Sequence, residues 1–218
     1  LMAGRCLPSG VHIELEGPPV SRPYLELTLE IMRHFGATDV QHDDVEFYVP
    51  PGGYEAQDYE VEGDWSAAAM VLVASWIMRK PVSIPNVKAA SAQGDKIIIP
   101  MLNELERQRP HRFDLSDCPD LITPLATACV FANHPTEITG VAHARVKECD
   151  RIYALASELA RLGVSIKERH GGLFIQPTNR LTSARLNPFD DHRMAMAFGL
   201  LSLRQPGIEV LNKNCVSK

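Results

Sequence analysis

The chain has 218 residues, of which 45% are hydrophobic and 22% charged, a composition typical of one or two globular domains. The formal net charge of −5 argues against a general nucleic-acid binder and against a protein that binds membrane surfaces. Because it shows no signal-peptide pattern and no apolar run of about 18 residues, the sequence predicts a cytoplasmic protein without a membrane span.

The cysteine and histidine patterns give no sign of a metal site. The five cysteines are scattered and include no C-x-x-C pair, which is typical of reduced thiols in a cytosol. Cys149 lies inside a charged segment and is interpreted as a spacer rather than as a reactive thiol. The eight histidines show neither H-x-x-x-H nor H-x-x-E-H spacing, so no structural or catalytic metal is predicted.

Strands and helices alternate along the first part of the chain. Residues 11–15 alternate like a half-buried strand, and a helix follows with Ser21 as its N-cap, Pro23 in its first turn and a stop at Gly36. Residues 45–49 read as a second strand, and the Pro-Pro-Gly-Gly run at 50–53 as a loop and possible boundary.

The same alternation continues to the end of the chain. Helices are predicted after a cap at Asp64, from 93–95 to 105, over 120–131, from Arg151 to a stop at Gly163, and from a cap at Asp190 or Asp191 to 203. Strands are predicted at 82–84, 137–139, 164–167, 173–175 and 208–211. A repeated β-α-β-α-β-β order accounts for this pattern, so the fold class is α/β or α+β, with helix N-termini converging on one face.

The most informative segment is residues 145–151, Arg-Val-Lys-Glu-Cys-Asp-Arg, at the start of an amphipathic helix. Asp150 suits an N-cap, but Arg145, Lys147 and Arg151 are cations at a helix N-terminus, where they oppose the dipole. A bound phosphate or carboxylate would resolve that conflict, and we favour a ligand over an exposed charged helix start.

Three further helix starts leave two interpretations open. In Asp190-Asp191-His192-Arg193 the cations again oppose the dipole, which favours a second anion pocket. Ser21-Arg22-Pro23-Tyr24 reads first as an ordinary N-cap and second as a ligand contact. Asp120 and Asp117, three residues apart, read first as caps and second as a candidate general base. Together these segments indicate one or two small polyanionic substrates bound among helix N-termini, with carboxylates available for proton transfer.

These residues resemble a known set of signatures. Arg145-Val146-Lys147-Glu148-x-Asp150-Arg151 and Asp191-His192-Arg193-Met194-Ala195-Met196 are similar to the signatures of the 5-enolpyruvylshikimate-3-phosphate synthase family. Further matches are Val20-Ser21-x-Pro23-Tyr24, Glu62-Gly63-Asp64, Pro119-Asp120 and Cys215-x-x-Lys218. The resemblance covers the full length of the chain, and the first two motifs are its most specific part.

The resemblance implies a fold and a reaction. The fold has two similar domains of β-α-β-α-β-β units that close over the ligands. The enzyme, a transferase, moves the enolpyruvyl group of phosphoenolpyruvate to the 5-hydroxyl of shikimate 3-phosphate by addition and elimination through a tetrahedral ketal. It releases phosphate and uses no metal and no organic cofactor, as part of the shikimate pathway of aromatic amino acid biosynthesis.

The resemblance also implies site residues. Asp120 would take the proton of the 5-hydroxyl, Glu148 would handle protons at the phosphoenolpyruvate methylene, and Lys147 would assist near the 5-hydroxyl. Phosphoenolpyruvate would be held by Arg151, Arg193 and Lys218. Ser21 and Tyr24 would contact the phosphate of shikimate 3-phosphate. The other expected substrate-binding residues are Asp64, His143, which stands where the family often has Asn, and His192.

Finally, the resemblance predicts how much of the enzyme is present. The family's chain is about twice as long, so we expect residues 1–61 to be the end of the shikimate-phosphate-side domain and residues 62–218 most of the second domain. The missing N-terminal half is then an expected partner, and this chain alone should turn over poorly. Two alternatives stay open: an enolpyruvyl transferase acting on UDP-N-acetylglucosamine, and a non-catalytic module that binds phosphorylated metabolites.

Overall fold

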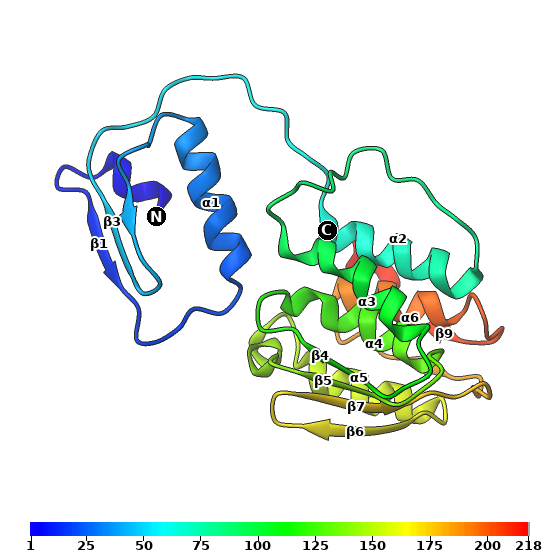
Figure 1. Cartoon of the computed structure of the whole chain (residues 1–218). Coiled ribbons are helices and arrows are strands. Elements are labelled where there is room, and N and C mark those ends of the chain that lie inside the picture. Colours follow the sequence, from blue (N-terminus) through cyan, green and yellow to red (C-terminus); the bar gives the residue numbers. More distant parts are fainter. Residues whose placement is uncertain (218) are drawn as a thin grey trace. The chain divides into compact units, whose positions relative to one another are not determined.

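The computed structural model describes residues 1–217, which form two compact units. Unit 1 consists of Leu1–Glu62 with Ala90–Gly94, and unit 2 begins with Gly63–Ala89 and continues from Asp95 (Figure 1). No helix in the described part of the chain combines the length and the apolar character that crossing a bilayer requires.

Unit 1 is a three-stranded antiparallel sheet with one helix. The 3-10 helix η1 (Met2–Cys6) precedes β1 (Val11–Glu14), α1 (Arg22–His34), β2 (Gln41–His42) and β3 (Glu46–Val49), and the strand order is β1-β3-β2. Its small core contains Met32, Ala37 and Val49. Arg5 ties the ends of the unit together, because its Nη1 donates to Asp39 Oδ1 at 2.6 Å and its Nε to the Gly53 carbonyl at 3.0 Å.

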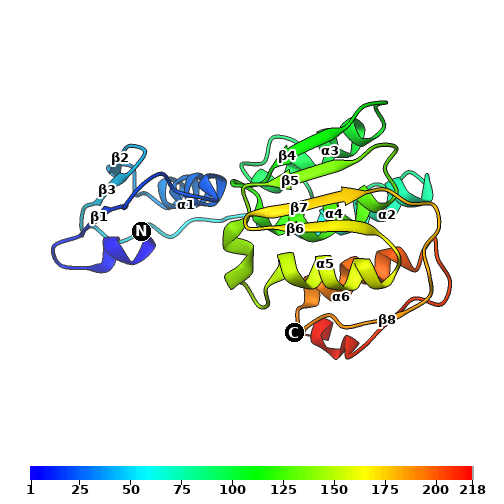
Figure 2. The same cartoon turned by 90° about the horizontal axis from the view of Figure 1, so that it is seen from below.

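Unit 2 contains one complete β-α-β-α-β-β run, the order proposed from the sequence, although the first strand of the run was not predicted. The run consists of β4 (His111–Asp114), α4 (Ile122–Val130), β5 (Thr136–Thr139), α5 (Arg151–Arg161), β6 (Ser165–Arg169) and β7 (Gly172–Gln176). The sheet order is β4-β5-β7-β6, with β4 parallel to β5 and the other neighbours antiparallel (Figure 2). This arrangement confirms the α/β fold class.

Five further helices and two short strands lie outside this run. They are α2 (Trp65–Met78), η2 (Gly94–Ile97), α3 (Ile98–Leu105), β8 (Arg185–Leu186), α6 (His192–Leu201), β9 (Glu209–Val210) and η5 (Lys213–Ser217). The helices lie on one face of the four-stranded sheet, and α4 packs between that sheet and the pair α2 and α6 (Figure 1). All nine residues of α4 are therefore buried, and it forms the centre of the core.

Two predicted helix starts follow directly from local chemistry. Asp64 caps α2 by accepting from the backbone N–H groups of Ser66 and Ala67, and Asp150 caps α5 by accepting from Tyr153 N at 2.9 Å. The predicted stop of α5 is also confirmed, since Gly163 follows it with φ +83°, a conformation that favours glycine.

The structure corrects several predicted elements. Residues 82–84 are not a strand, because the segment lies in an irregular loop between Pro81 and Pro85 and pairs with no described strand. Asp120 does not cap α4: it lies inside the one-turn helix η3 (Pro119–Leu121) that leads into α4. Strands β2, β4 and β8 were not predicted. Of the two candidate caps of α6, the structure selects Asp191.

Candidate active site

Arg151, the first residue of α5, is the centre of a buried charge cluster. Its side chain is only 1% exposed, and its three guanidinium nitrogens each donate to a carboxylate. Nε donates to Asp191 Oδ2 and Nη1 to Asp120 Oδ1, both at 2.7 Å. Nη2 donates to Glu148 Oε2, also at 2.7 Å. The cluster brings together the starts of α4, α5 and α6, so the predicted convergence of helix N-termini holds in unit 2.

Asp191 is the most deeply buried carboxylate of the cluster. Its side chain has no exposed surface, and Oδ1 caps α6 by accepting from Arg193 N at 2.8 Å and from Met194 N at 3.4 Å. Burial works against its charged form. The hydrogen bond and charge of Arg151, with the two backbone N–H groups, outweigh that burial and lower the pKa of Asp191. The ionised carboxylate therefore holds the start of α6 directly and the start of α5 through Arg151.

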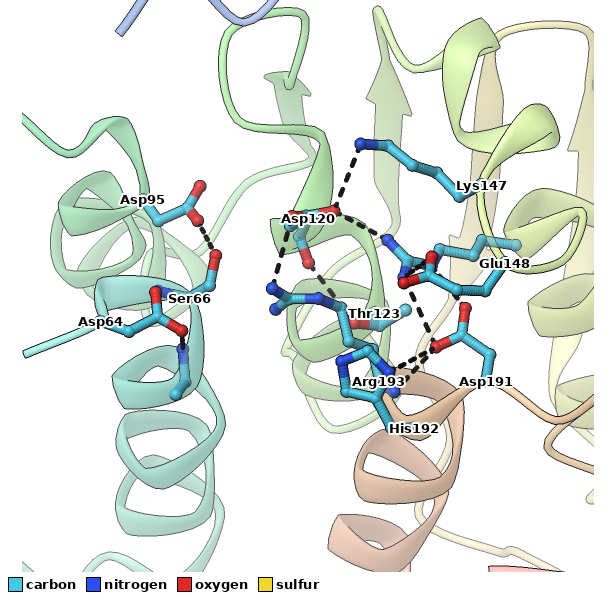
Figure 3. Close-up of polar contacts among 12 residues, drawn as sticks. Asp64, Ser66, Asp95, Asp120, Thr123, Lys147, Glu148, Asp191, His192 and Arg193 are labelled. Atoms are coloured by element: carbon cyan, nitrogen blue, oxygen red, sulfur yellow. Dashed lines mark hydrogen bonds and ion pairs between the residues drawn. The ribbon is translucent and has the colours of Figure 1, made fainter. Parts of the chain in front are cut away.

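Asp120 is the carboxylate on which the predicted cations meet. Besides Arg151, Lys147 Nζ lies 3.9 Å from Oδ1 and Arg193 Nη2 lies 3.4 Å from Oδ2 (Figure 3). The sequence separations of these residues from Asp120 range from 27 to 73, so only the fold brings them together. The carboxylate can accept a proton, and the three cations around it can bind an anionic ligand.

Lys147, Glu148 and His143 lie at the more open edge of the cluster. The side chains of Lys147 and Glu148 are 37% and 42% exposed, so both can reach a ligand from solvent. Nε2 of His143 is buried without a hydrogen-bond partner in the described chain. Burial, and then the positive charge of Lys147, lower the pKa of His143, which favours a neutral imidazole beside the cluster.

Arg145 is paired with carboxylates of the protein itself, so it does not need the bound anion that the sequence suggested. Its Nη1 donates to Asp150 Oδ2 at 2.8 Å, and its Nη2 pairs with Glu168 Oε1 at the same distance. Nε and Nη2 also donate to the carbonyls of His170 and Arg169. Arg145 therefore fastens the cap of α5 to the β6–β7 hairpin.

The remaining predicted residues of unit 2 lie at the starts of α6 and α2. His192 is the first residue of α6, and its Nδ1 is 3.9 Å from Asp191 Oδ1. Asp64 uses both carboxylate oxygens to cap α2. Next to it, the hydroxyl of Ser66 donates to the buried Asp95 (Figure 3).

The two predicted residues of unit 1 lie at the start of α1. Ser21 occupies the N-cap position with φ 59°, and its side chain makes no capping hydrogen bond. The predicted N-cap position of Ser21 is therefore confirmed, although its side chain does not cap the helix, and its role as a ligand contact stays a prediction. Tyr24 is 42% exposed. Lys218 lies outside the described residues.

Sequence reasoning missed two members of the cluster. Asp191 was predicted only as a cap, and nothing in the sequence indicates that it also binds Arg151, 40 residues away. Cys149 donates its thiol to Asp191 Oδ2 at 3.6 Å. The described residues contain no group of three or more His, Cys, Asp or Glu side chains placed to hold a metal ion.

Solved structures define the class of fold. The chain is similar over its whole length to 5-enolpyruvylshikimate-3-phosphate (EPSP) synthase from Acinetobacter baumannii, with a TM-score of 0.78, 21% identity and 56% of that chain covered. It is also similar to the enolpyruvyl transferase NikO from Streptomyces tendae, with a TM-score of 0.67 and 15% identity over 98% of this chain and 53% of that one. The fold is that of the enolpyruvyl transferases.

Sequence comparison narrows the class to one family. The sequence model of EPSP synthase (3-phosphoshikimate 1-carboxyvinyltransferase) matches residues 1–218, and the chain belongs to this family. It is 35% identical to 3-phosphoshikimate 1-carboxyvinyltransferase from Idiomarina loihiensis, covering all of this chain and 55% of that protein. It is 34% identical to the enzyme of the same name from Methanocaldococcus jannaschii, over 92% of this chain and 50% of that protein. The chain thus spans about half the length of the curated relatives it matches.

Proposed function

We propose that this chain supplies the proton-transfer and anion-binding groups for moving the enolpyruvyl group of phosphoenolpyruvate to the 5-hydroxyl of shikimate 3-phosphate. The observation that carries the proposal is the position of Asp120, within 4 Å of cationic nitrogens of Lys147, Arg151 and Arg193. Family membership supports this reaction, and the geometry supports the choice of these residues.

Electrostatics is the first task of such a site. Both reactants carry several negative charges and repel each other in water. Cations fixed in place before the ligands arrive offset that repulsion without reorganising during the reaction. We assign this task to Arg193, Arg151 and Lys218. Arg151 also fixes the carboxylates of Asp120 and Glu148, because its nitrogens donate to both.

Proton transfer is the second task. In the addition, the oxygen of the 5-hydroxyl bonds to C2 of phosphoenolpyruvate while Asp120 accepts the hydroxyl proton. The methylene carbon of phosphoenolpyruvate gains a proton from Glu148. In the elimination, the bond from C2 to the phosphate oxygen breaks, phosphate leaves, and Glu148 takes a methyl proton back as the double bond forms again. Lys147, 3.9 Å from Asp120, assists at the 5-hydroxyl.

Unit 1 is proposed to contribute the phosphate contacts of shikimate 3-phosphate through Ser21 and Tyr24. Its β1-α1-β2-β3 order and its sheet order β1-β3-β2 repeat β5-α5-β6-β7 and β5-β7-β6 of unit 2. The start of α1 is therefore the topological equivalent of the start of α5, where the charge cluster lies. This correspondence supports assigning residues 1–61 and 62–218 to two similar domains.

The proposal is tested by binding and turnover. Titration calorimetry with phosphoenolpyruvate, shikimate 3-phosphate and UDP-N-acetylglucosamine is expected to show binding of the first two ligands, weakened by Arg193→Gln. Arg185→Gln is the matched control, because Arg185 is an exposed arginine paired with Glu209. Preferential binding of UDP-N-acetylglucosamine would transfer the assignment to the related transferase.

Phosphate release separates an enzyme from a binding module. It is measured with both substrates on this chain and, for comparison, on a full-length member of the family, and we expect low turnover from the chain alone. If Asp120→Asn leaves phosphate release unchanged in an active preparation, Asp120 is not the general base and its assignment fails. Binding of both ligands without any phosphate release would instead indicate a binding module.

A further inference from the structure

A cavity of about 300 Å³ lies in unit 2 at the C-terminal ends of its helices, away from the Asp120 site. Residues at or just after the ends of α2, α4, α6 and β7 line it. Helix α6 begins at the charge cluster and runs 10 residues toward the cavity, a length of about 15 Å. The cavity is therefore separate from the groups assigned to enolpyruvyl transfer.

The lining of this cavity is cationic and rich in hydrogen-bond donors. Among the described residues that line it are Arg79, Arg204 and Asn133, and none is acidic. This is unusual in a chain with a net charge of −5. The other side of the lining is apolar, formed by Phe131, Ile77 and neighbouring residues. A ligand that fits both parts combines an anionic group with a flat apolar body.

Trp76 supplies a second, independent observation. It lines the cavity, and its indole Nε1 is buried with no hydrogen-bond partner in the described chain. Buried N–H donors are almost always paired in native proteins, so an unpaired donor on a residue that lines the cavity favours an acceptor supplied from outside the chain. An anionic oxygen is the strongest acceptor available.

The two arginines are placed differently. Arg204 is fixed, because Nη1 donates to the Ile77 carbonyl at 3.0 Å and its guanidinium carbon lies 5.8 Å from the Phe131 ring centroid. Arg79 ends α2 in the left-handed conformation. Its side chain is 73% exposed, and its paired carboxylate, Glu106, is 3.9 Å away. A guanidinium has five N–H donors in a planar fork that matches a carboxylate, so either arginine can bind one.

We propose that this cavity binds a small planar carboxylate built on a single ring. The carboxylate is held by Arg79 and Arg204 and accepts from Trp76 Nε1, and the ring lies against Phe131 and Ile77. The volume favours a small ligand, since about 300 Å³ is at the lower end of the range for ligand pockets. The proposal does not depend on the enolpyruvyl-transfer assignment.

The test is a titration of the ¹⁵N-labelled chain with benzoate, followed by the indole N–H resonances. We expect a saturable shift of the Trp76 signal with a dissociation constant on the order of 1 mM. Trp76→Phe assigns the signal. Trp65 is the internal control, because its Nε1 already donates to the Lys88 carbonyl. Benzamide, which has the same shape without charge, should cause a much smaller shift.

Two variants distinguish a built site from weak stacking of a ring. Arg204→Gln and Arg79→Gln should each weaken benzoate binding by about tenfold. Because Arg79 is largely exposed, its variant remains informative if Arg204→Gln fails to fold. Unchanged affinity in Arg79→Gln, equal binding of benzamide, or no shift of the Trp76 signal would each overturn the proposal.

Discussion

Arg151 and Asp191 form an ion pair in the core of unit 2, with Nε 2.7 Å from Oδ2 and side-chain exposures of 1% and 0%. A buried pair of this kind forms at a high desolvation cost, which the mutual attraction and the additional hydrogen bonds must offset. Here Arg151 also binds Asp120 and Glu148, and Asp191 also caps α6. The pair therefore holds the starts of three helices in one arrangement.

Replacing Asp191 by Asn should destabilise the protein strongly. The amide keeps the size and one oxygen for the helix cap, but it removes the charge that faces the buried Arg151 guanidinium. Breaking one side of a buried ion pair typically costs about 3–5 kcal/mol. Urea denaturation followed by circular dichroism measures the loss.

Glu209→Gln is the control for this measurement. It removes one carboxylate from the exposed pair with Arg185, and the free energy of unfolding should change by less than about 1 kcal/mol. If the free energy of unfolding decreases equally in the two variants, the Arg151–Asp191 pair stabilises the protein no more than an exposed pair does.

Replacing Asp120 by Asn should reduce the rate of phosphate release in an active preparation by roughly 10²–10⁴-fold, the usual range for a general base. The amide oxygen can still accept a hydrogen bond from Arg151, which also keeps its pairs with Asp191 and Glu148, so the fold should be retained. Asp117→Asn is the matched control, three residues earlier in the same segment. A larger loss from the Asp117 variant would move the base to that residue.

Cys149 should react slowly with alkylating reagents. Burial, followed by the charge and hydrogen bond of Asp191, raises the pKa of its thiol to about 12, so little thiolate exists near pH 8. Cys6 is exposed. Iodoacetamide labelling followed by peptide mass spectrometry should find Cys6 modified well before Cys149. Rapid labelling of Cys149 in the folded Cys6→Ser variant would contradict the assignment as a spacer.

The sequence predicted the helices of unit 2 well because their signals are local. Asp64 and Asp150 precede apolar residues at helical spacing, and Gly163 follows α5, as the structure shows. Strand β4 was missed because His-Arg-Phe-Asp has little apolar character. The segment forms a strand because it pairs in parallel with β5, which lies 25 residues further along the chain.

The sequence predicted the cations of the charge cluster but not the carboxylates that pair with them. Cations at the start of α5 were expected to face a bound phosphate or carboxylate, and Arg151 instead pairs with carboxylates of the chain. The anions in the structure are the protein's own carboxylates, Asp120 and Asp191, which lie 31 and 40 residues away in sequence. Contacts at such separations depend on the tertiary fold, so helix caps and dipoles alone could not identify these partners.

Two glycines should respond oppositely to alanine. A Cβ on Gly172 would lie 1.8 Å from the Ile138 carbonyl oxygen on the adjacent strand, so Gly172→Ala must disturb the β5–β7 pairing. Gly199 lies inside α6 with nothing within 4 Å of such a Cβ, and alanine there should stabilise the helix by about 0.5–1 kcal/mol. Thermal unfolding of both variants tests the pair. A stable Gly172→Ala variant would show that the two strands can separate at little cost.

His111 should make the protein less stable as the pH falls. The residue is 4% exposed on β4, and both ring nitrogens lack a hydrogen-bond partner among residues 1–217. Burial is the main cause that lowers the pKa of His111; the charge of Glu104 opposes it, and those of His134 and Arg109 add to it. Because the folded state then binds fewer protons than the unfolded state, the free energy of unfolding should decrease as the pH falls below about 6.5, the unfolded pKa.

His111→Phe should remove this part of the pH dependence. It should also raise stability near pH 6 by about 1 kcal/mol or more, because two buried polar nitrogens no longer lack partners. Urea denaturation from pH 5 to pH 8 compares the variant with the parent chain. His170→Gln, at an exposed position, controls for the loss of an imidazole elsewhere on the sheet. If the parent and His111→Phe show the same slope between pH 5 and 6.5, the buried imidazole is not the group that links stability to pH.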